Sequence, residues 1–254
     1  MVKTAIQLYT LRKFDVKEST KVRIASETDV DGVEMEYYGP PSDATLAALD
    51  ETGLEVAGLS AGLDDFQHSL DELVTTCKAF DCETIILGYL DEKHFRSVQA
   101  THRTANLLNS LADTVNEQGL RFLYHTNRHE FTSSDGRTHF DILADETDDG
   151  VEFELDLGWI GVTGTNPHSV LEDFGHRTAS VHLKDMRFEE EKFVNLGDGD
   201  LNVRETAQAA IDVGVEWLVY EHEDPVDPVE SVVAGASKLS LFKKNGLTAD
   251  SFSS

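Results

Sequence analysis

The chain has 254 residues, 40% of them hydrophobic, which is enough to build a sizeable core. It carries 21 lysine and arginine residues against 48 aspartate and glutamate residues, so its formal net charge is −27 at pH 7. Because a field of this sign repels DNA, RNA and anionic membrane surfaces, the composition argues against a nucleic-acid or membrane partner.

Short β-branched runs alternate with longer helical patterns along the chain. The predicted strands are, in chain order, TAIQLYT (4–10), DGVEMEY (31–37), EVAGLS (55–60), ETIILGY (83–89), RFLYHT (121–126), VEFELDLGW (151–159), ASVHLKD (179–185) and EWLVYEHE (216–223). The predicted helices cover about 16–27, 44–53, 70–80, 95–118, 140–145, 168–174, 203–213 and 229–242. Gly53 and Gly119 are predicted to stop the helices that precede them.

This alternation predicts the fold class. About eight strand–helix units follow one another at a spacing near 30 residues, and such units favour a parallel sheet. Eight of them at this length fit a closed α/β barrel, the (β/α)8 TIM barrel, better than an open sheet. Since no shift in composition marks a boundary, we expect a single barrel domain over 1–246 and a polar C-terminal tail over 247–254.

Several bulk features bear on location and partners. The N-terminal segment lacks the apolar core of a signal peptide, and no run reaches the roughly 18 apolar residues of a membrane span, so we expect a cytoplasmic protein. Cys77 and Cys82 lack the Cys-x-x-Cys spacing and are expected to be inert packed thiols. The acidic excess suggests adaptation to high cytoplasmic salt, as in a halophile, with an ordinary acidic protein as the alternative. The sequence does not determine the oligomeric state, and a homo-oligomer is one of the possibilities.

Chemically capable side chains gather at the ends of four successive predicted strands, where the active site of such a barrel lies. They are His125, Asn127, His129 and Glu130 after the fifth strand, Asp156 and Trp159 after the sixth, His182, Lys184 and Asp185 after the seventh, and Glu221, His222 and Glu223 after the eighth. Because successive strands are neighbours, we expect these side chains to share one barrel mouth. By contrast, GDGD at 197–200 has no phosphate-loop spacing and is predicted to be a turn.

Strand alternation sharpens this expectation. Glu152, Glu154 and Asp156 share one face of their strand, and His182 and Lys184 share a face of the next. A parallel strand buried on both sides normally reads as almost continuously apolar, so these faces should meet polar partners in the barrel lumen. Buried carboxylates need cations or hydrogen bonds. A set of Glu, Asp, His and Glu suits one divalent metal ion such as Mn, Zn or Mg.

The chain resembles the xylose isomerase-like TIM-barrel superfamily, in its sugar phosphate isomerase/epimerase branch. The motifs that carry the resemblance are IQLYTLR (6–12), DGVEMEYYG (31–39), YHTNRHEF (124–131), LDLGW (155–159), VHLKDM (181–186) and YEHED (220–224). They cover nearly the whole chain, and LDLGW followed by VHLKD is their most specific combination. The resemblance implies one divalent metal ion held by Glu130, Asp156, His182 and Glu221.

The resemblance also implies an activity, which is isomerisation or epimerisation of a small sugar, sugar phosphate or polyol through an enediolate. Glu130 and Glu221 would move the proton on a carbon next to a carbonyl that the metal polarises. We expect the substrate to be bound by Gln7, Arg12, His125, Trp159 and Lys184. Lys184 should point at a substrate oxygen, and Asp185 should either orient Lys184 or cap the next turn.

Two departures keep other functions open. Relatives often carry YHNH where this chain has YHTN, which puts Asn127 in place of a histidine, and they often end the third strand with a histidine where this chain has Ser60. A metal-dependent dehydratase or lyase on a keto-sugar or inosose is one alternative, and a barrel that binds a sugar without turnover is another. The substitution at Ser60 and the net charge of −27 argue against a DNA-repair endonuclease of the AP type.

Overall fold

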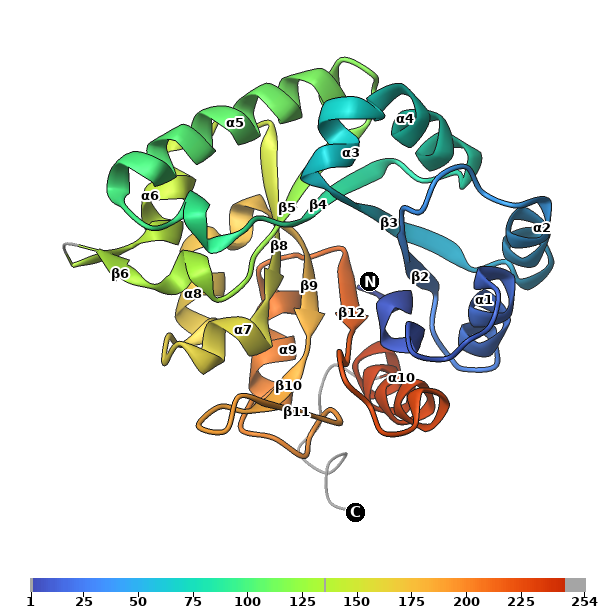
Figure 1. Ribbon diagram of the computed structural model, residues 1–254. Helices are drawn as coiled ribbons and strands as arrows, with labels where there is room; N and C mark the ends of the chain where they lie inside the picture. Colours follow the sequence, from blue (N-terminus) through green and yellow to red (C-terminus); the bar gives the residue numbers. More distant parts are fainter. Residues whose placement is uncertain (1, 135, 245–254) are drawn as a thin grey trace.

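Eight parallel strands close into a barrel, and helices lie around it (Figure 1). The structure is a computed structural model that describes residues 2–134 and 136–244. The strands follow one another around the barrel in the order β1-β12-β9-β8-β5-β4-β3-β2. Their bounds are β1 (Lys3–Gln7), β2 (Gly32–Glu36), β3 (Glu55–Gly62), β4 (Thr84–Tyr89), β5 (Arg121–His125), β8 (Val151–Asp156), β9 (Thr178–Leu183) and β12 (Trp217–Tyr220). The predicted single-domain (β/α)8 TIM barrel is confirmed.

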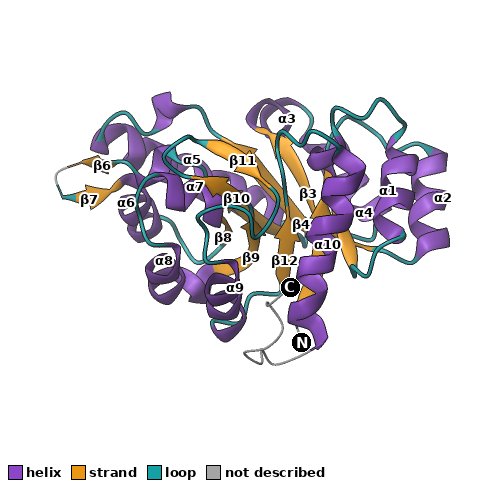
Figure 2. Ribbon diagram, turned by 90° about the horizontal axis from the view of Figure 1, so that it is seen from below, coloured by secondary structure: helices purple, strands orange, loops and turns teal. Residues whose placement is uncertain are grey.

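The helices form the outer layer, which Figure 2 shows from a second direction. They are α1 (Glu18–Ser26), α2 (Asp43–Thr52), α3 (Leu63–His68), α4 (Leu70–Ala79), α5 (Val98–Asn116), α6 (His139–Glu146), α7 (Leu157–Val162), α8 (Pro167–Phe174), α9 (Val203–Asp212) and α10 (Pro228–Lys244). Local signals set their ends. The Ser42 hydroxyl accepts a hydrogen bond from the Thr45 N–H at the start of α2, and Gly53, with φ of 68°, ends this helix as predicted.

The hydrophobic core lies between the barrel and the helices. In β8, Val151, Phe153 and Leu155 are fully buried in this core. The alternate residues Glu154 and Asp156 are also buried, and they contact histidines of the neighbouring strands. The predicted alternation is confirmed, because successive side chains of a strand point to opposite faces. β8 is therefore anchored by its apolar face while it delivers two carboxylates to the barrel interior.

Several predicted strands end earlier than expected, and two of them, the first and the sixth, are followed directly by a helical turn. The first ends at Gln7, whose side-chain oxygen accepts the Tyr9 N–H, and the 3-10 helix η1 (Leu8–Leu11) follows. The sixth ends at Asp156, whose Oδ1 accepts the N–H groups of Gly158 and Trp159 and caps α7. In both places a polar side chain at the strand end captures backbone donors of the next residues and starts a helical turn.

Several short elements were not predicted, because segments of two to six residues carry little or no periodicity. They are α3, the hairpin of β6 (Ser133–Ser134) and β7 (Arg137–Thr138), the hairpin of β10 (Asp185–Arg187) and β11 (Lys192–Val194), and the 3-10 helices η2 (Glu92–His94), η3 (His129–Phe131) and η4 (Gly175–Arg177). The predicted tail over 247–254 lies outside the described residues. Within the described ranges, no helix has the length and apolar character needed to cross a membrane.

Candidate active site

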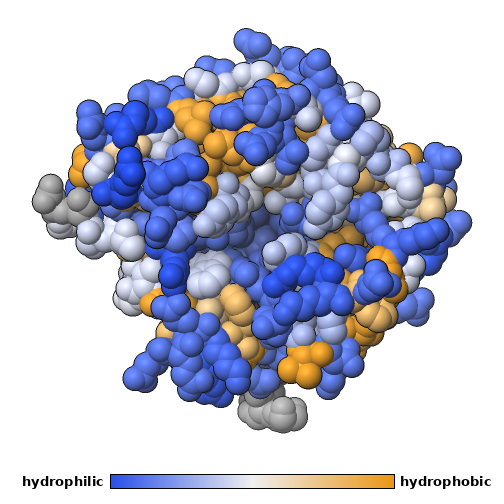
Figure 3. Space-filling model, viewed as in Figure 1, coloured by the Kyte–Doolittle hydropathy of each residue, from blue (hydrophilic) through white to orange (hydrophobic). Residues whose placement is uncertain are grey.

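A cavity of about 420 Å³ opens at the C-terminal ends of the barrel strands. Figure 3 shows this face of the molecule, which is hollowed near its centre and mostly hydrophilic there. The lining comes from all eight barrel strands or from the segments that directly follow them. Its members are Gln7, Tyr9, Glu34, Glu36, Ser60, Ala61, Gly62, Gly88, Tyr89, His125, Asn127, Trp159, His182, Lys184, Glu221 and Glu223. Both the position and the volume are typical of a small-molecule site.

Strand register brings three of the four predicted metal ligands together. Asp156 on β8 pairs with His182 on β9, and Glu221 directly follows β12, which pairs with β9. One ligand atom from each of these three residues lies within 4.8 Å of the others. His182 Nδ1 is 3.0 Å from Glu221 Oε2. All three side chains are buried, so the group forms a compact site of two carboxylates and one imidazole.

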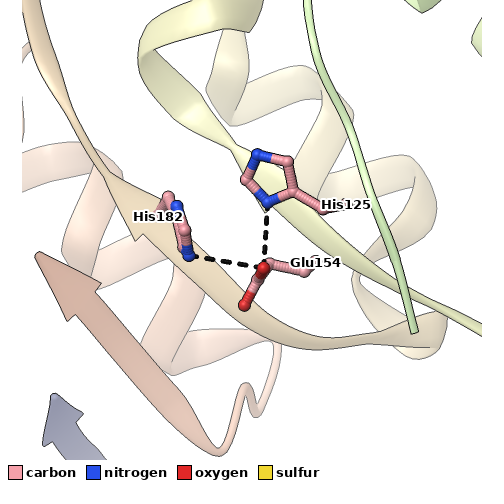
Figure 4. A group of neighbouring side chains, drawn as sticks. All are labelled: His125, Glu154 and His182. Carbon is pink, nitrogen blue, oxygen red and sulfur yellow. Dashed lines mark hydrogen bonds and ion pairs between the residues drawn. The ribbon is translucent and has the colours of Figure 1, made fainter. Parts of the chain in front are cut away.

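A second group shares His182 with the first. Figure 4 shows His125, Glu154 and His182, whose ligand atoms also lie within 4.8 Å of one another. Glu154 Oε2 lies 2.9 Å from His125 Nδ1 and 3.3 Å from His182 Nε2. The carboxylate of Glu34 extends this group, since its Oε1 is 3.0 Å from His182 Nε2 and accepts from Gln7. Glu34 Oε2 is buried and has no hydrogen-bond partner within the described part of the chain.

Lys184 is the centre of an ion-pair network. Its Nζ lies 2.6 Å from Asp156 Oδ2, 2.7 Å from Glu221 Oε2 and 2.7 Å from Glu223 Oε1. Only 1% of this lysine is exposed. Burial by itself lowers the pKa of the ammonium, but the three carboxylates outweigh burial and hold the pKa well above its ordinary value. The side chain therefore stays charged and bridges three strand ends.

Burial and the neighbouring charges shift the pKa values of the carboxyl groups in the site in opposite directions. Burial raises the pKa of Glu221, but the ammonium of Lys184 and the imidazole of His182 outweigh burial and lower it. Around Glu34 burial dominates, and the neighbouring carboxylate of Glu154 raises its pKa further. Burial and the charge of Glu221 raise the pKa of Glu36 to about 8. At neutral pH the cavity thus holds ionised Glu221 beside protonated Glu36.

The donor set fits a divalent metal ion. Asp156, His182 and Glu221 offer hard oxygen and imidazole nitrogen ligands, the mixture that Mn, Zn and Mg accept. Buried carboxylates at this density require cations nearby. Part of this requirement is met by Lys184 and by His182, whose pKa is raised by the charges of Glu154 and Glu34 despite burial. The orphaned Oε2 of Glu34 marks further capacity to bind a cation.

Two predicted site residues lie elsewhere. The buried carboxylate of Glu130 accepts hydrogen bonds from the Tyr124 hydroxyl and, at 3.1 Å, from the Asn127 N–H, and it does not line the cavity. Burial raises its pKa to about 7. The guanidinium of Arg12 stacks over the ring of Tyr9 at 4.0 Å, behind a residue that does line the cavity. Both positions follow from contacts with ring side chains that the sequence pattern does not encode.

The other predicted substrate residues line the cavity, and some residues of the site were missed. Gln7, His125, Trp159 and Lys184 are in the lining. The residues that the sequence did not point to include Tyr9, Glu34, Glu36 and Tyr89, whereas Glu154 and Glu223 were expected at the lumen face and the mouth without a named role. A signal for two of them existed, because Glu34 and Glu36 alternate at the end of the second strand as the acids of the sixth strand do.

The two departures from the family pattern both lie in the cavity. Ser60 and Asn127 are part of its lining. Asn127 Nδ2 is buried and lacks a hydrogen-bond partner among the residues that the structure describes. Because a buried amide without a partner is costly, this group is available to donate to a bound molecule. The changes from histidine thus alter the surface that a ligand meets.

Asp185 caps the loop after β9, which decides between its two predicted roles. Its carboxylate accepts the N–H groups of Gly197 (2.8 Å), Gly199 (3.0 Å) and Leu201 (3.1 Å), as well as that of Met186 (2.9 Å). A Cβ on Gly199 would lie 2.1 Å from Asp185 Oδ1, so this position requires glycine. The GDGD segment is a turn that folds around a carboxylate.

Comparison with known proteins identifies the family. A family model described as xylose isomerase-like TIM barrel matches residues 22–240. The chain therefore belongs to the xylose isomerase-like TIM-barrel family, as the motifs predicted. Among solved structures, a sugar phosphate isomerase/epimerase from Parabacteroides distasonis ATCC 8503 superposes with a TM-score of 0.78 at 16% identity, covering 94% of this chain and 95% of that one.

Two further comparisons concern a second solved structure and a curated relative that matches part of the chain. The probable 3-DHS dehydratase AsbF from Bacillus anthracis superposes with a TM-score of 0.76 at 16% identity, covering 94% of this chain and 99% of that one. At these identities the likeness concerns the fold alone. An inosose dehydratase of Clostridium botulinum (strain Alaska E43 / Type E3) is 29% identical over 167 residues, which are 57% of this chain and 55% of the relative. The chain thus spans about half the length of the curated relatives that it matches.

Proposed function

We propose that the protein removes a proton from the carbon next to the carbonyl of a small polyhydroxylated compound and returns it as an isomerase or epimerase. The observation that carries the proposal is the convergence of Asp156, His182 and Glu221 within 4.8 Å at a strand-end cavity. These residues would hold one divalent ion, which would polarise a substrate carbonyl when bound.

Two glutamates of the cavity suit the proton transfer. Glu221 is ionised at neutral pH because Lys184 and His182 lower its pKa, so it can accept a proton. Glu36 has a pKa raised to about 8, so it carries a proton that it can return. Carboxyl groups whose environments push their pKa values apart are the usual pair of base and acid. Glu130, which the resemblance implied for this role, has its carboxylate outside the cavity lining.

Dehydration is the second candidate. It begins with the same proton removal and then expels a hydroxyl group from the adjacent carbon. The curated relatives at 28–33% identity are named inosose dehydratases, and this favours it. The two candidates differ only in the fate of the intermediate, so one experiment separates them.

The test is solvent exchange. The purified protein is supplied in turn with Mn²⁺, Zn²⁺ and Mg²⁺ and incubated in deuterated water with a panel of ketoses, aldoses and keto-inositols. We expect deuterium at the carbon next to the carbonyl, seen by NMR, with an isomer as product for the first candidate and a dehydrated ketone for the second. Absence of exchange with every compound and metal would contradict both.

A pair of variants ties the reaction to the site. Glu221→Gln should lower the exchange rate by roughly 10²–10⁴-fold, the usual contribution of a general base. Glu216→Gln is the matched control, since this carboxylate precedes β12 at the other end of the barrel and pairs with Arg121. Equal rates in the two variants would remove Glu221 from the mechanism.

A further inference from the structure

The charged groups around the cavity indicate which class of substrate it can bind. This inference rests on the proposed function. We propose that the cavity takes an uncharged polyhydroxylated ketone or aldehyde and rejects its phosphorylated or carboxylated counterparts. Three independent observations carry this inference: the charge of the lining, the occupation of its lysine, and the filled backbone cradle beside the mouth.

The lining is acidic. It includes Glu34, Glu36, Glu221 and Glu223, whereas Lys184 is its only lysine or arginine among the described residues. Inside a cavity, charges interact more strongly than in water, so an anionic group would meet the carboxylates of Glu221 and Glu223 with little screening. A divalent ion at Glu221 would still leave the carboxylate of Glu223 beside the ligand, together with Glu36, whose raised pKa makes it a neutral hydrogen-bonding group.

The lysine is already bound. Lys184 makes contacts of 2.6–2.7 Å with Asp156, Glu221 and Glu223. An ammonium group has three N–H donors, and three carboxylates already surround this one. A substrate phosphate would have to displace a carboxylate that is fixed to a barrel strand end. The predicted contact between Lys184 and the substrate is therefore expected only with an uncharged oxygen, such as a hydroxyl or carbonyl oxygen, that lies beside the ion pairs of Lys184.

The backbone position for an anion is filled by the protein itself. TIM barrels frequently bind phosphate with the loops after the seventh and eighth strands. Here the loop after β9, the seventh barrel strand, directs the N–H groups of Gly197, Gly199 and Leu201 to the carboxylate of Asp185. Since these donors are satisfied internally, the loop offers no cradle to a substrate phosphate.

The other residues of the lining can bind the hydroxyl groups of a ligand and pack against its carbon–hydrogen faces. The buried amide of Asn127 lacks a partner in the described chain, and the Ser60 hydroxyl also lines the cavity. The rings of Tyr9, Tyr89 and Trp159 provide apolar faces. Such a mixture of single hydrogen-bonding groups and aromatic surface is typical of sites for neutral ligands.

The test compares matched ligand pairs by isothermal titration calorimetry on the full chain, with and without Mn²⁺. Fructose, glucose and other hexoses are each measured against their own phosphate esters, and keto-inositols are added as neutral ligands. We expect the tightest neutral compound to bind at least tenfold more tightly than any ester. An ester that binds as tightly as the best neutral compound, or failure of every neutral compound to bind, would overturn the inference.

A variant tests the role of the lysine network. Glu223→Gln removes one of the three partners of Lys184 and should reduce the discrimination against phosphate esters several-fold. Glu216→Gln, outside the cavity, should leave it unchanged. An unchanged ratio in Glu223→Gln would overturn the argument from Lys184.

The solvent-exchange experiment separates this inference from the proposed function. Exchange with phosphate esters in preference to neutral compounds would refute the substrate class and leave the reaction standing. Selective binding of neutral compounds without exchange would refute the reaction and leave the substrate class standing.

Discussion

Asp156 uses its two carboxylate oxygens for different purposes. Oδ1 accepts the N–H groups of Gly158 and Trp159 at 3.0 Å and begins α7, whereas Oδ2 lies 2.6 Å from Lys184 Nζ at the cavity. The same residue therefore ends a strand, caps a helix and offers an oxygen to the proposed metal ion. A change at this residue can separate these roles, because asparagine caps helices about as well as aspartate does.

We expect Asp156→Asn to weaken Mn²⁺ binding by at least about tenfold, the lower end of the loss that even outer partners of metal sites cause. Because the cap survives in Asp156→Asn, Asp156→Ala should cost about 1 kcal/mol more in the free energy of unfolding. Titration calorimetry and urea unfolding measure the two effects. Glu152→Gln, on the same strand beside Arg121, is the control and should bind Mn²⁺ normally. Equal Mn²⁺ affinity in Asp156→Asn would exclude this ligand.

Asp185 is the residue that holds the loop after β9. Asp185→Ala leaves four backbone N–H groups without their acceptor, and we expect a loss of roughly 2–4 kcal/mol in urea unfolding. Inorganic phosphate should restore part of this loss, and chloride at equal ionic strength should not, since the vacated donors form an anion cradle. Asp198→Ala, at an exposed position of the same loop, should change stability by less than about 0.5 kcal/mol. A null effect of Asp185→Ala would show that the loop folds without the carboxylate.

At the scale of elements, α5 and α6 are joined by a buried histidine. Thr138 and Asp141 form a capping box at the start of α6. The first residue of this helix, His139, places its Nδ1 2.7 Å from the Thr101 hydroxyl on α5 and packs against the ring of Phe95. Burial lowers the pKa of His139 below its ordinary value of 6.5, so the neutral ring belongs to the packed state.

This pKa shift predicts a pH dependence of stability. Since the folded-state pKa lies below 6.5, the unfolded chain binds the proton more readily, and the contribution of His139 is present above pH 6.5 and lost as the pH falls below it. The loss is at most about 1.4 kcal/mol per pH unit for one proton. His139→Gln should therefore lose less stability than the wild type between pH 8 and pH 5.5 in urea unfolding. Parallel curves for the two proteins would contradict the assignment.

At the scale of the whole molecule, the charge of −27 is carried mostly by exposed acids. Most of the described surface ion pairs, such as Lys3–Glu55 and Arg23–Glu51, join single pairs of exposed side chains. Pairs of this kind contribute little, so the unpaired excess of negative charge opposes the compact state. Salt relieves this repulsion by screening.

We accordingly expect the free energy of unfolding to rise between low ionic strength and molar KCl. Urea unfolding followed by circular dichroism at several KCl concentrations measures it. Sucrose, which stabilises compact states without screening charge, is the comparison. Equal stability at low and molar KCl would refute the proposal of adaptation to high salt and favour an ordinary acidic protein.

The sequence by itself determined the barrel, most of its strand ends and the trio of Asp156, His182 and Glu221. These features are local, because consecutive residues determine both the alternation of a strand and its polar end. In a TIM barrel the C-terminal ends of all strands lie on one face, so the polar ends come together. The family resemblance rests on the same short motifs, and the family match confirmed it.

Only the tertiary structure decided how the side chains at the mouth pair. The carboxylate of Glu130 turns to Tyr124, and Lys184 binds three carboxylates from two other strand ends. Asp185 folds a loop up to 16 residues away around itself. Such contacts join residues far apart in sequence, and their outcome depends on the competition among many charges in one buried volume. A linear pattern contains the competing groups but does not fix which of them meet.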